Sequence, residues 1–182
     1  MKPLSQYSDI HSHLPELAER GDTIVNISPG DEMLPNGTYS IGIHPWETAD
    51  KIPTLNQLKR LITVAHDPRV VAIGECGFDR LRGGDINLQT SLFDFHARLA
   101  RKVGKPLIIH AVKADDLLLA AVHRLRPQTG QWIIHGFRGK PQAAKQLIAA
   151  GFSLSIGEKY NPDTVSVIPQ ERLYHETDAV TL

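Results

Sequence analysis

Two histidines near the start of the chain, His11 and His13, have a spacing that suits metal binding. They lie at and just after the end of a short apolar run, residues 7–11, which predicts a β-strand. Side chains two positions apart on a strand point to the same face, so both imidazoles can reach one cation. Imidazole nitrogens are common ligands of divalent cations such as zinc. Two ordinary polar residues at a strand end are the alternative, which this pair alone leaves open.

Other residues that can bind a metal stand where further apolar runs end. They are His44, Glu75, His110, His135 and Asp178. The carboxyl ends of parallel strands converge on one mouth of a barrel, and active sites form there. Histidines with scattered structural roles would have no reason to end successive strands. The pattern therefore predicts a metal centre at which these side chains gather with His11 and His13.

These predicted ligands exceed what one tetrahedral ion needs, and they suit two divalent cations that share a carboxylate. Glu75 is the expected bridge because its strand is central. A mixture of imidazole and carboxylate fits zinc, manganese or a similar ion, and fits magnesium less well. Two such cations can stabilise both the attacking and the leaving oxygen of a phosphoryl displacement, and they lower the pKa of a bound water towards about 7. The predicted hydrolysis requires no serine or cysteine nucleophile.

The remaining histidines are expected to have other roles. His66, His96 and His123 fall in helical segments, where surface or helix-end positions are expected. His175 lies in the last predicted strand, where the alternation of side chains does not give it the geometry of a ligand, and it is expected to be structural. Cys76 is expected to be a small buried hydrophobic residue rather than a soft metal ligand.

The elements that must position the predicted ligands alternate between strand and helix. Short runs rich in β-branched residues predict strands at residues 7–11, 23–27, 39–43, 70–75, 106–110, 132–135, 152–156 and 173–177. Apolar residues at helical spacing predict helices at residues 55–65, 88–103, 117–125 and 141–150. This alternation is typical of a parallel sheet, and eight strands predict a TIM-type (β/α)8 barrel.

The length of the chain predicts a reduced form of this fold. It has 182 residues, whereas such barrels typically need about 250. The segments after the first two predicted strands, residues 14–21 and 29–37, are short or rich in proline and glycine, and the chain ends soon after the eighth. We therefore expect one domain over residues 1–182, a minimal or distorted barrel that lacks some outer helices, including the last one.

Composition excludes several classes of protein. The chain has 20 basic and 20 acidic residues, so its zero net charge excludes a generally basic nucleic-acid coat but not a local basic site. Its single cysteine excludes a disulfide scaffold. No apolar run approaches the roughly 20 residues that span a bilayer, and the first residues do not form a signal peptide. A cytoplasmic protein with no membrane partner is expected.

The loops after the predicted strands carry cations that could bind an anionic substrate. They are Arg80, Arg82, Lys113, Arg138, Lys140 and Lys159. Phosphate is the commonest anion bound by such groups, although charges merely exposed to solvent are the alternative. Aspartates and glutamates in the same loops weaken the indication. Phe137 could stack on a base or pack in the core, and Trp46 could line the mouth or pack under a loop.

Six segments in order along the chain resemble those of the TatD-type metal-dependent deoxyribonucleases, in particular a short subgroup of that family. They are residues 9–14 (Asp-Ile-His-Ser-His-Leu), 42–45 (Gly-Ile-His-Pro), 74–80 (Gly-Glu-Cys-Gly-Phe-Asp-Arg), 106–110 (Pro-Leu-Ile-Ile-His), 134–139 (Ile-His-Gly-Phe-Arg-Gly) and 176–179 (Glu-Thr-Asp-Ala). The resemblance implies a TIM-type barrel. It also implies hydrolysis of phosphodiester bonds in DNA, often from a strand end, with magnesium or another divalent ion.

The resemblance further implies a role for each site residue. The first ion would be held by His11, His13, Glu75 and Asp178, and the second by Glu75, His110 and His135. Asp178 would orient or deprotonate the attacking water, so that Glu75 and Asp178 are the candidate catalytic residues. His44 would face the substrate phosphate, with Lys113 and Arg138 as further substrate-binding candidates.

Two departures from the family pattern bear on these roles. Many members have an arginine two positions after the histidine that corresponds to His110, whereas this chain has Val112 followed by Lys113, which could take over the phosphate contact. Members also continue into a final helix, whereas this chain ends four residues after Asp178. Apolar barrel surface left exposed in this way predicts a homodimer.

Two alternative functions remain open. A barrel of this type can hydrolyse other small ester, amide or phosphomonoester substrates, since a fold does not determine function. Glu75, where amide-cleaving relatives commonly carry a carbamylated lysine, favours a phosphoesterase. The second alternative is a truncated, catalytically weak barrel that only binds metal.

Overall fold

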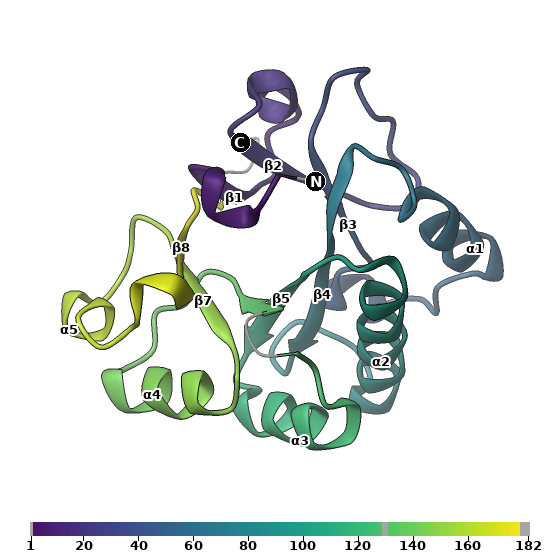
Figure 1. The fold of residues 1–182 in the computed structure, drawn as a ribbon. Coiled ribbons are helices and arrows are strands. Elements are labelled where there is room, and N and C mark those ends of the chain that lie inside the picture. The colour runs from purple at the N-terminus through teal and green to yellow at the C-terminus, as the bar shows by residue number, and fades with distance from the viewer. Residues whose placement is uncertain (1, 129–130, 179–182) are drawn as a thin grey trace.

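The computed structural model describes residues 2–128 and 131–178. Parallel strands pair in chain order, from β1 to β8, and curve into a nearly closed barrel (Figure 1). Their bounds are Asp9–Ser12 (β1), Thr23–Ile27 (β2), Tyr39–Ile41 (β3), Val70–Asp79 (β4), Leu107–Val112 (β5), Trp132–Ile134 (β6), Ser153–Ile156 (β7) and Leu173–His175 (β8). The TIM-type barrel predicted from the sequence is confirmed.

Helices cover part of the outside of the barrel. They are α1 (Leu55–Val64), α2 (Ile86–Val103), α3 (Asp115–Leu125), α4 (Pro141–Ala149) and α5 (Pro162–Val165), and the 3-10 turns are η1 (Leu4–Gln6), η2 (Pro15–Arg20), η3 (Pro45–Thr48) and η4 (Gln170–Arg172). The four predicted helices are confirmed. Thr54 caps α1 and Asp85 caps α2, each accepting hydrogen bonds from backbone N–H groups of the first turn. In the ranges described, no helix is long and apolar enough to cross a membrane.

The cover is thinnest beside the first three strands. A single 3-10 turn, η2, separates β1 from β2, and residues 28–38 connect β2 to β3 without a helix (Figure 1). The barrel thus has fewer outer helices than a full (β/α)8 barrel, as the sequence predicted. The predicted lack of a final helix concerns the residues after Asp178, which lie outside the described part of the chain.

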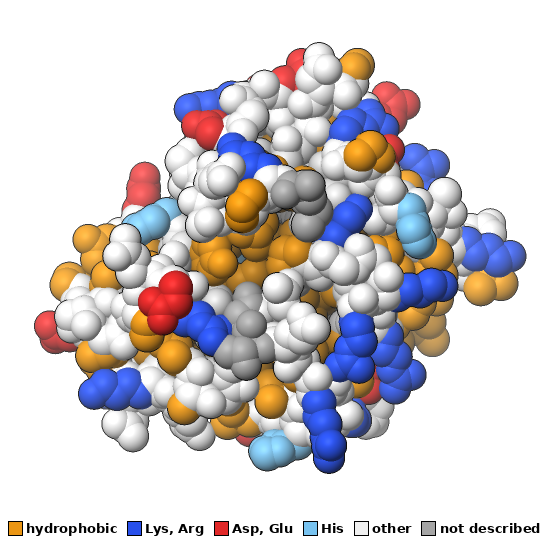
Figure 2. Space-filling view, viewed as in Figure 1, with side chains coloured by type: hydrophobic (Ala, Val, Ile, Leu, Met, Phe, Trp, Pro, Cys, Tyr) orange, Lys and Arg blue, Asp and Glu red, His pale blue; other side chains and the backbone are white. Residues whose placement is uncertain are grey.

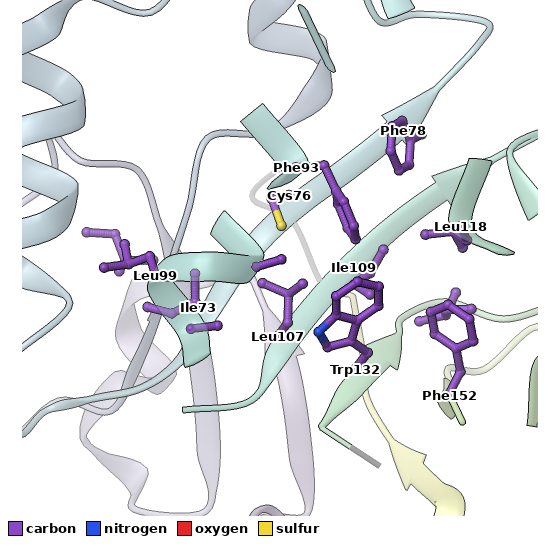
Figure 3. Close-up of a cluster of buried hydrophobic side chains, with 14 of the residues drawn as sticks. Ile73, Cys76, Phe78, Phe93, Leu99, Leu107, Ile109, Leu118, Trp132 and Phe152 are labelled. Carbon is purple, nitrogen blue, oxygen red and sulfur yellow. The ribbon is translucent and has the colours of Figure 1, made fainter. Parts of the chain in front are cut away.

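Hydrophobic side chains form two layers. The larger layer packs the outer faces of the strands against the helices, and Figure 3 shows its part around Phe93, Ile109 and Trp132. A smaller cluster of Ile10, Ile24, Val71 and Ile133 forms a separate buried group. Cys76 is 1% exposed in the larger layer, so the expectation of a small buried residue is confirmed.

An irregularity in β4 determines which of its side chains enter the barrel. Ile73 pairs with Leu107 and Cys76 with Ile109, so β4 contains one more residue than β5 between these pairs. Such a bulge reverses the alternation of side chains. As a result Ile73 and Cys76 both pack in the outer layer, and Glu75 points inward.

The prediction that these strands end at their ligands is wrong for β4 and β5. β4 continues to Asp79, and β5 continues beyond His110 to Val112. The reason is that residues 76–79 pair with residues 109–112, which extends both strands past the predicted ligands. A side chain at Gly77 would collide with the backbone oxygen of His110, so only glycine allows this close pairing.

Basic side chains gather at the end of α2, on the right of the face seen in Figure 2. A cavity of about 740 Å³ lies there, and its lining includes Arg98, Arg101 and Lys105. Arg101 donates to the backbone oxygen of Arg126 (2.8 Å), and Lys105 donates to that of Ala65 (2.6 Å). These cations satisfy carbonyl groups where helices end, which accounts for their clustering without a ligand.

Candidate metal centre

Glu75 is buried at the mouth of the barrel, and its two carboxylate oxygens face different imidazoles. The side chain is 2% exposed, and Oε2 lies 3.2 Å from Nε2 of His11 and 3.3 Å from Nε2 of His13. Asp178 adds a second carboxylate, since its Oδ1 lies 3.8 Å from the same two nitrogens. Residues from both ends of the chain and from its middle therefore meet on this side of Glu75.

The other oxygen of Glu75, Oε1, faces three further imidazoles. It lies 2.7 Å from Nδ1 of His110, 2.7 Å from Nε2 of His135 and 3.0 Å from Nε2 of His44. The facing nitrogens of His44 and His110 are only 3.2 Å apart. One carboxylate thus connects two groups of potential ligands.

The donor atoms of this cluster fit a divalent cation. Three groups of residues have ligand atoms within 4.8 Å of one another, namely His11 with His13 and Glu75, His44 with Glu75 and His110, and His11 with His135 and Asp178. Within residues 2–128 and 131–178, neither ring nitrogen of His11 has a hydrogen-bond partner, although the residue is fully buried. Burying an unpaired polar atom is costly, and a cation on Nε2 would remove that cost.

Carboxylates behind two of the imidazoles determine which nitrogen is free to bind a metal. Nε2 of His110 lies 3.1 Å from Oδ2 of Asp79, which can only accept, and this favours the proton on Nε2 and the lone pair on Nδ1. Nδ1 of His135 faces Oε1 of Glu176 at 3.4 Å, which favours the proton on Nδ1 and the lone pair on Nε2. Both free nitrogens face Glu75, as metal ligands require.

His44 has a different arrangement. Its Nδ1 accepts a hydrogen bond from the backbone N–H of Trp46 (3.1 Å), at the start of η3. Burial lowers the pKa of His44, which favours the neutral ring. A neutral ring whose Nδ1 accepts carries its proton on Nε2, which then donates and has no lone pair for a metal. This geometry favours His44 as a donor to an anion over a role as a ligand.

Three residues that sequence reasoning did not place in the site hold its members. Asn26 accepts a hydrogen bond from the backbone N–H of Glu75 (2.6 Å), and Asp79 and Glu176 face His110 and His135. Signals for two of them existed in the sequence: Asn26 is a polar residue inside an apolar strand, and Glu176 is two positions before Asp178. Asp79 was missed because the strand was predicted to end at Glu75, whereas β4 continues to Asp79.

The electrostatics of the cluster keep its buried carboxyl groups ionised. Burial acts to raise the pKa of Glu75, but the charges of the surrounding imidazoles, above all His135 and His11, hold it well below its ordinary value. Burial is likewise outweighed at Asp79, where hydrogen bonds from Trp46, Arg82 and His110 lower the pKa to about 2. Anionic carboxylates are the form that binds a cation.

The cluster opens into a cavity of about 790 Å³. Its lining combines the potential ligands with apolar side chains such as Leu34 and Trp46, and with the acidic residues Asp31, Glu32 and Glu47. The predicted substrate-binding residues Lys113 and Arg138 are exposed and are not part of this lining. Trp46 is 39% exposed at the mouth, whereas Phe137 is 9% exposed and packs in the core.

The other histidines lie apart from the cluster. His66 and His123 are exposed near the ends of α1 and α3, as predicted, and His175 is exposed in β8. The expectation of a surface or helix-end position is wrong for His96, which is fully buried in the middle of α2. Its Nε2 accepts a hydrogen bond from the backbone N–H of Ile43 (3.0 Å), so the ring connects α2 to the segment that carries His44.

The sequence matches the family model described as TatD related DNase over residues 30–180. It is 32% identical over 148 residues to the 3'-5' ssDNA/RNA exonuclease TatD of Erwinia billingiae, covering 76% of this chain and 56% of that protein. It is 31% identical over 154 residues to the uncharacterized metal-dependent hydrolase YjjV of Escherichia coli, covering 77% of this chain and 57% of that protein. The chain spans just over half the length of these curated relatives.

Two solved structures are similar to this one. The crystal structure of YjjV, a TatD homolog from Escherichia coli, has a TM-score of 0.74 at 24% identity, covering 97% of this chain and 80% of that one. A hydrolase TatD family protein from Entamoeba histolytica has a TM-score of 0.73 at 21% identity, covering 95% and 73%. At these identities the likeness shows the fold alone. The family model, by contrast, matches most of the chain, which therefore belongs to the TatD-related DNases, a family of metal-dependent hydrolases.

Proposed function

We propose that residues 1–182 form one hydrolase domain that cleaves phosphodiester bonds of DNA from the end of a single strand with two divalent ions, Mg²⁺, Mn²⁺ or Zn²⁺. The observation that carries the proposal is that the two carboxylate oxygens of Glu75 face two groups of imidazoles in one cavity. Two cations that share a carboxylate suit displacement at phosphorus. The name of one relative, a 3'-5' exonuclease of single-stranded DNA and RNA, supports the same substrate class.

The proposal assigns each ligand atom to one of two ions. The first would be held by Nε2 of His11 and of His13, Oε2 of Glu75 and Asp178, and the second by Oε1 of Glu75, Nδ1 of His110 and Nε2 of His135. When bound, such ions polarise a phosphate and lower the pKa of water. Asp79, behind His110, and Glu176, behind His135, favour the tautomers that this assignment needs.

Asp178 and His44 would act on the reacting groups. The carboxylate of Asp178 is 35% exposed, so it can take the proton of the attacking water. The water oxygen bonds to phosphorus and the bond to the ester oxygen of the leaving strand breaks. The proton passes from Asp178 to that oxygen, which leaves as a hydroxyl group. The Nε2–H group of His44 would donate to a phosphate oxygen.

A nuclease assay with single strands labelled at either end tests the proposal. We expect no cleavage after treatment with EDTA, and cleavage in single-nucleotide steps from one end after addition of Mg²⁺, Mn²⁺ or Zn²⁺. The variant Asp178→Ala should lose at least about 100-fold in rate. Asp50→Ala, which removes an exposed aspartate outside the cavity, should cleave like the wild type. Cleavage that resists EDTA, or equal rates in wild type and Asp178→Ala, would contradict the proposal.

One observation favours the alternative of a smaller substrate. Asp31, Glu32 and Glu47 line the cavity, and their charges oppose deep entry of a polyanion. The same assay therefore includes 4-nitrophenyl phosphate, 4-nitrophenyl acetate and a dipeptide. A kcat/KM at least about 100-fold higher for one of these than for DNA would show that the small molecule, and not DNA, represents the substrate class. No turnover of any substrate by the metal-loaded protein would favour a catalytically weak metal-binding barrel.

A further inference from the structure

A tryptophan beside the metal cluster is held in a fixed orientation. The ring centroid of Trp46 lies 4.7 Å from that of His44 and 5.8 Å from that of His110. Its Nε1–H donates to Oδ2 of Asp79 at 2.6 Å, and Asp79 is itself 1% exposed. The indole therefore forms a rigid wall at the mouth of the cavity.

Arg82 stacks on this wall. Its guanidinium carbon lies 3.4 Å from the centroid of the Trp46 ring, within the range of a strong cation–π contact. Its backbone N–H donates to Oδ1 of Asp79 (2.9 Å), the same carboxylate whose other oxygen holds the indole. Asp79 thus holds both the backbone of Arg82 and the indole ring of Trp46 on which the Arg82 side chain lies.

The charge of Arg82 is not neutralised by a neighbouring carboxylate. In the described part of the chain, no Asp or Glu oxygen lies within 4.0 Å of its guanidinium nitrogens. Arg80, two residues earlier, is instead paired with Asp116 at 2.6 Å and also donates to the backbone oxygen of Lys113. Of these two loop arginines, Arg82 is the one available to a ligand.

A stacked guanidinium is well suited to bind phosphate. Stacking uses the face of the group and leaves the N–H donors at its edge free, and these match two oxygens of a phosphate. Outside the metal cluster, the charged residues that line the cavity are acidic: Asp31, Glu32 and Glu47. Arg82 is not part of this lining but stacks on Trp46, which is, so its unpaired charge lies beside the mouth and would favour an anionic chain there.

We propose that Arg82, held against Trp46, binds a phosphate of the substrate strand next to the one that is cleaved. This inference rests on the proposed function, because it needs a substrate with more than one phosphate. Arg82 is one of the loop cations that the sequence indicated for an anionic substrate, and it would take the role predicted for Lys113 or Arg138. It also predicts that a single phosphodiester without a neighbouring phosphate does not use Arg82.

Binding and cleavage are measured separately to test this inference. Binding of a 5'-fluorescein single-stranded DNA is followed by anisotropy in EDTA, which prevents hydrolysis. Arg82→Ala should weaken binding at least about 5-fold, and the slope of log K against log salt should fall by about 0.7, the value for one phosphate contact on a single strand. Arg82→Lys should have an intermediate affinity for DNA, because lysine keeps the charge but lacks the planar guanidinium that stacks and donates two parallel hydrogen bonds. Arg98→Ala, which removes an exposed arginine of α2, should bind like the wild type.

Kinetics then separate substrate binding from a structural effect. Arg82→Ala should raise KM for the oligonucleotide about 10-fold and change kcat/KM for bis(4-nitrophenyl) phosphate less than about 3-fold. Unchanged DNA binding in Arg82→Ala, no binding by the wild type, or equal losses on both substrates would overturn the inference. Failure of the wild type to cleave DNA with any ion would instead contradict the proposed function. The anisotropy measurement would then still test whether Arg82 binds a phosphate.

Discussion

The carboxylate of Asp9 in β1 accepts hydrogen bonds from both the backbone N–H (3.2 Å) and the hydroxyl group (2.7 Å) of Thr177. The same carboxylate accepts from the backbone N–H of His11 (3.1 Å), and the backbone N–H of Asp178 donates to the carbonyl oxygen of His11 (3.0 Å). This contact joins the segment after the last strand to the first strand. It therefore holds His11 and Asp178 on one side of the metal centre.

Replacing Asp9 should separate these two elements. Asp9→Ala removes a carboxylate that is 7% exposed and leaves its donors unpaired, which we expect to cost about 1–3 kcal/mol of unfolding free energy. Affinity for divalent metal should fall about 10-fold or more because the segment that carries Asp178 loses its side-chain contact with β1. Urea unfolding and metal titration measure the two effects. Asp50→Ala is the exposed control, and an Asp9→Ala protein with wild-type metal affinity would contradict this role.

Asp79 should influence the metal centre without contacting an ion. In Asp79→Asn one oxygen becomes an NH₂ group, which accepts no hydrogen bond. Either the side chains of His110 and Trp46, which donate to Oδ2, or the backbone N–H groups that donate to Oδ1 then lose their acceptor. We expect a loss of about 10- to 100-fold in metal affinity or activity, the range for residues that orient a ligand. Asp116→Asn, which breaks an exposed pair with Arg80, should change metal affinity less than about 2-fold. Equal effects of the two variants would exclude the orienting role of Asp79.

His44 should matter for activity and not for metal content. Because its Nδ1 accepts from Trp46, the ring offers a proton and not a lone pair to the site. His44→Ala should keep the metal stoichiometry of the wild type, measured by mass spectrometry of the bound metals, and lose about 10²- to 10³-fold in kcat, as removal of a transition-state donor does. Loss of one ion in His44→Ala would show that the residue is a ligand.

His96 should make the fold sensitive to acid. Burial lowers the pKa of His96 to about 4, and protonation would also remove the acceptor for the N–H of Ile43. The pKa is about 6.5 in an unfolded chain, so this contribution to stability is complete above about pH 6.5 and is lost as the pH falls towards about 4. The loss amounts to about 3 kcal/mol.

The variant His96→Gln isolates this effect, because glutamine can accept from Ile43 but does not titrate. In urea unfolding with EDTA, the difference in stability between wild type and His96→Gln should shrink between pH 6.5 and pH 4. Titration of the other histidines contributes equally to both proteins and cancels. A difference that is constant over this range would contradict the prediction.

Much of the fold could be predicted because its periodic patterns are local. Helix α2 has an apolar stripe, an N-cap aspartate and a C-cap glycine, all of which are visible in the sequence. The strand ends were less predictable. Nothing in the residues around Glu75 shows that β4 pairs with β5 as far as Asp79, because that pairing depends on a partner about thirty residues away.

The sequence predicts which residues form the site better than it predicts how they are arranged. His11, Glu75, His110 and His135 were expected to meet because parallel strands bring them to one mouth. Asp79 was missed because β4 extends past its predicted end at Glu75, and the position of Glu176 behind His135 depends on how far each side chain reaches. The burial of His96 was missed for a related reason: its partner, Ile43, lies on another element.

The position of divalent ions around Glu75 tests the account most directly. Crystals of the protein soaked with Mn²⁺ or Zn²⁺ and measured at the absorption edge of the metal would locate the ions by anomalous scattering. We expect two peaks about 3.5–4 Å apart, one on each side of the Glu75 carboxylate. One would be bound by His11 and His13, and the other by Nδ1 of His110 and Nε2 of His135. A single peak, or no peak within coordination distance of Glu75, would contradict the account.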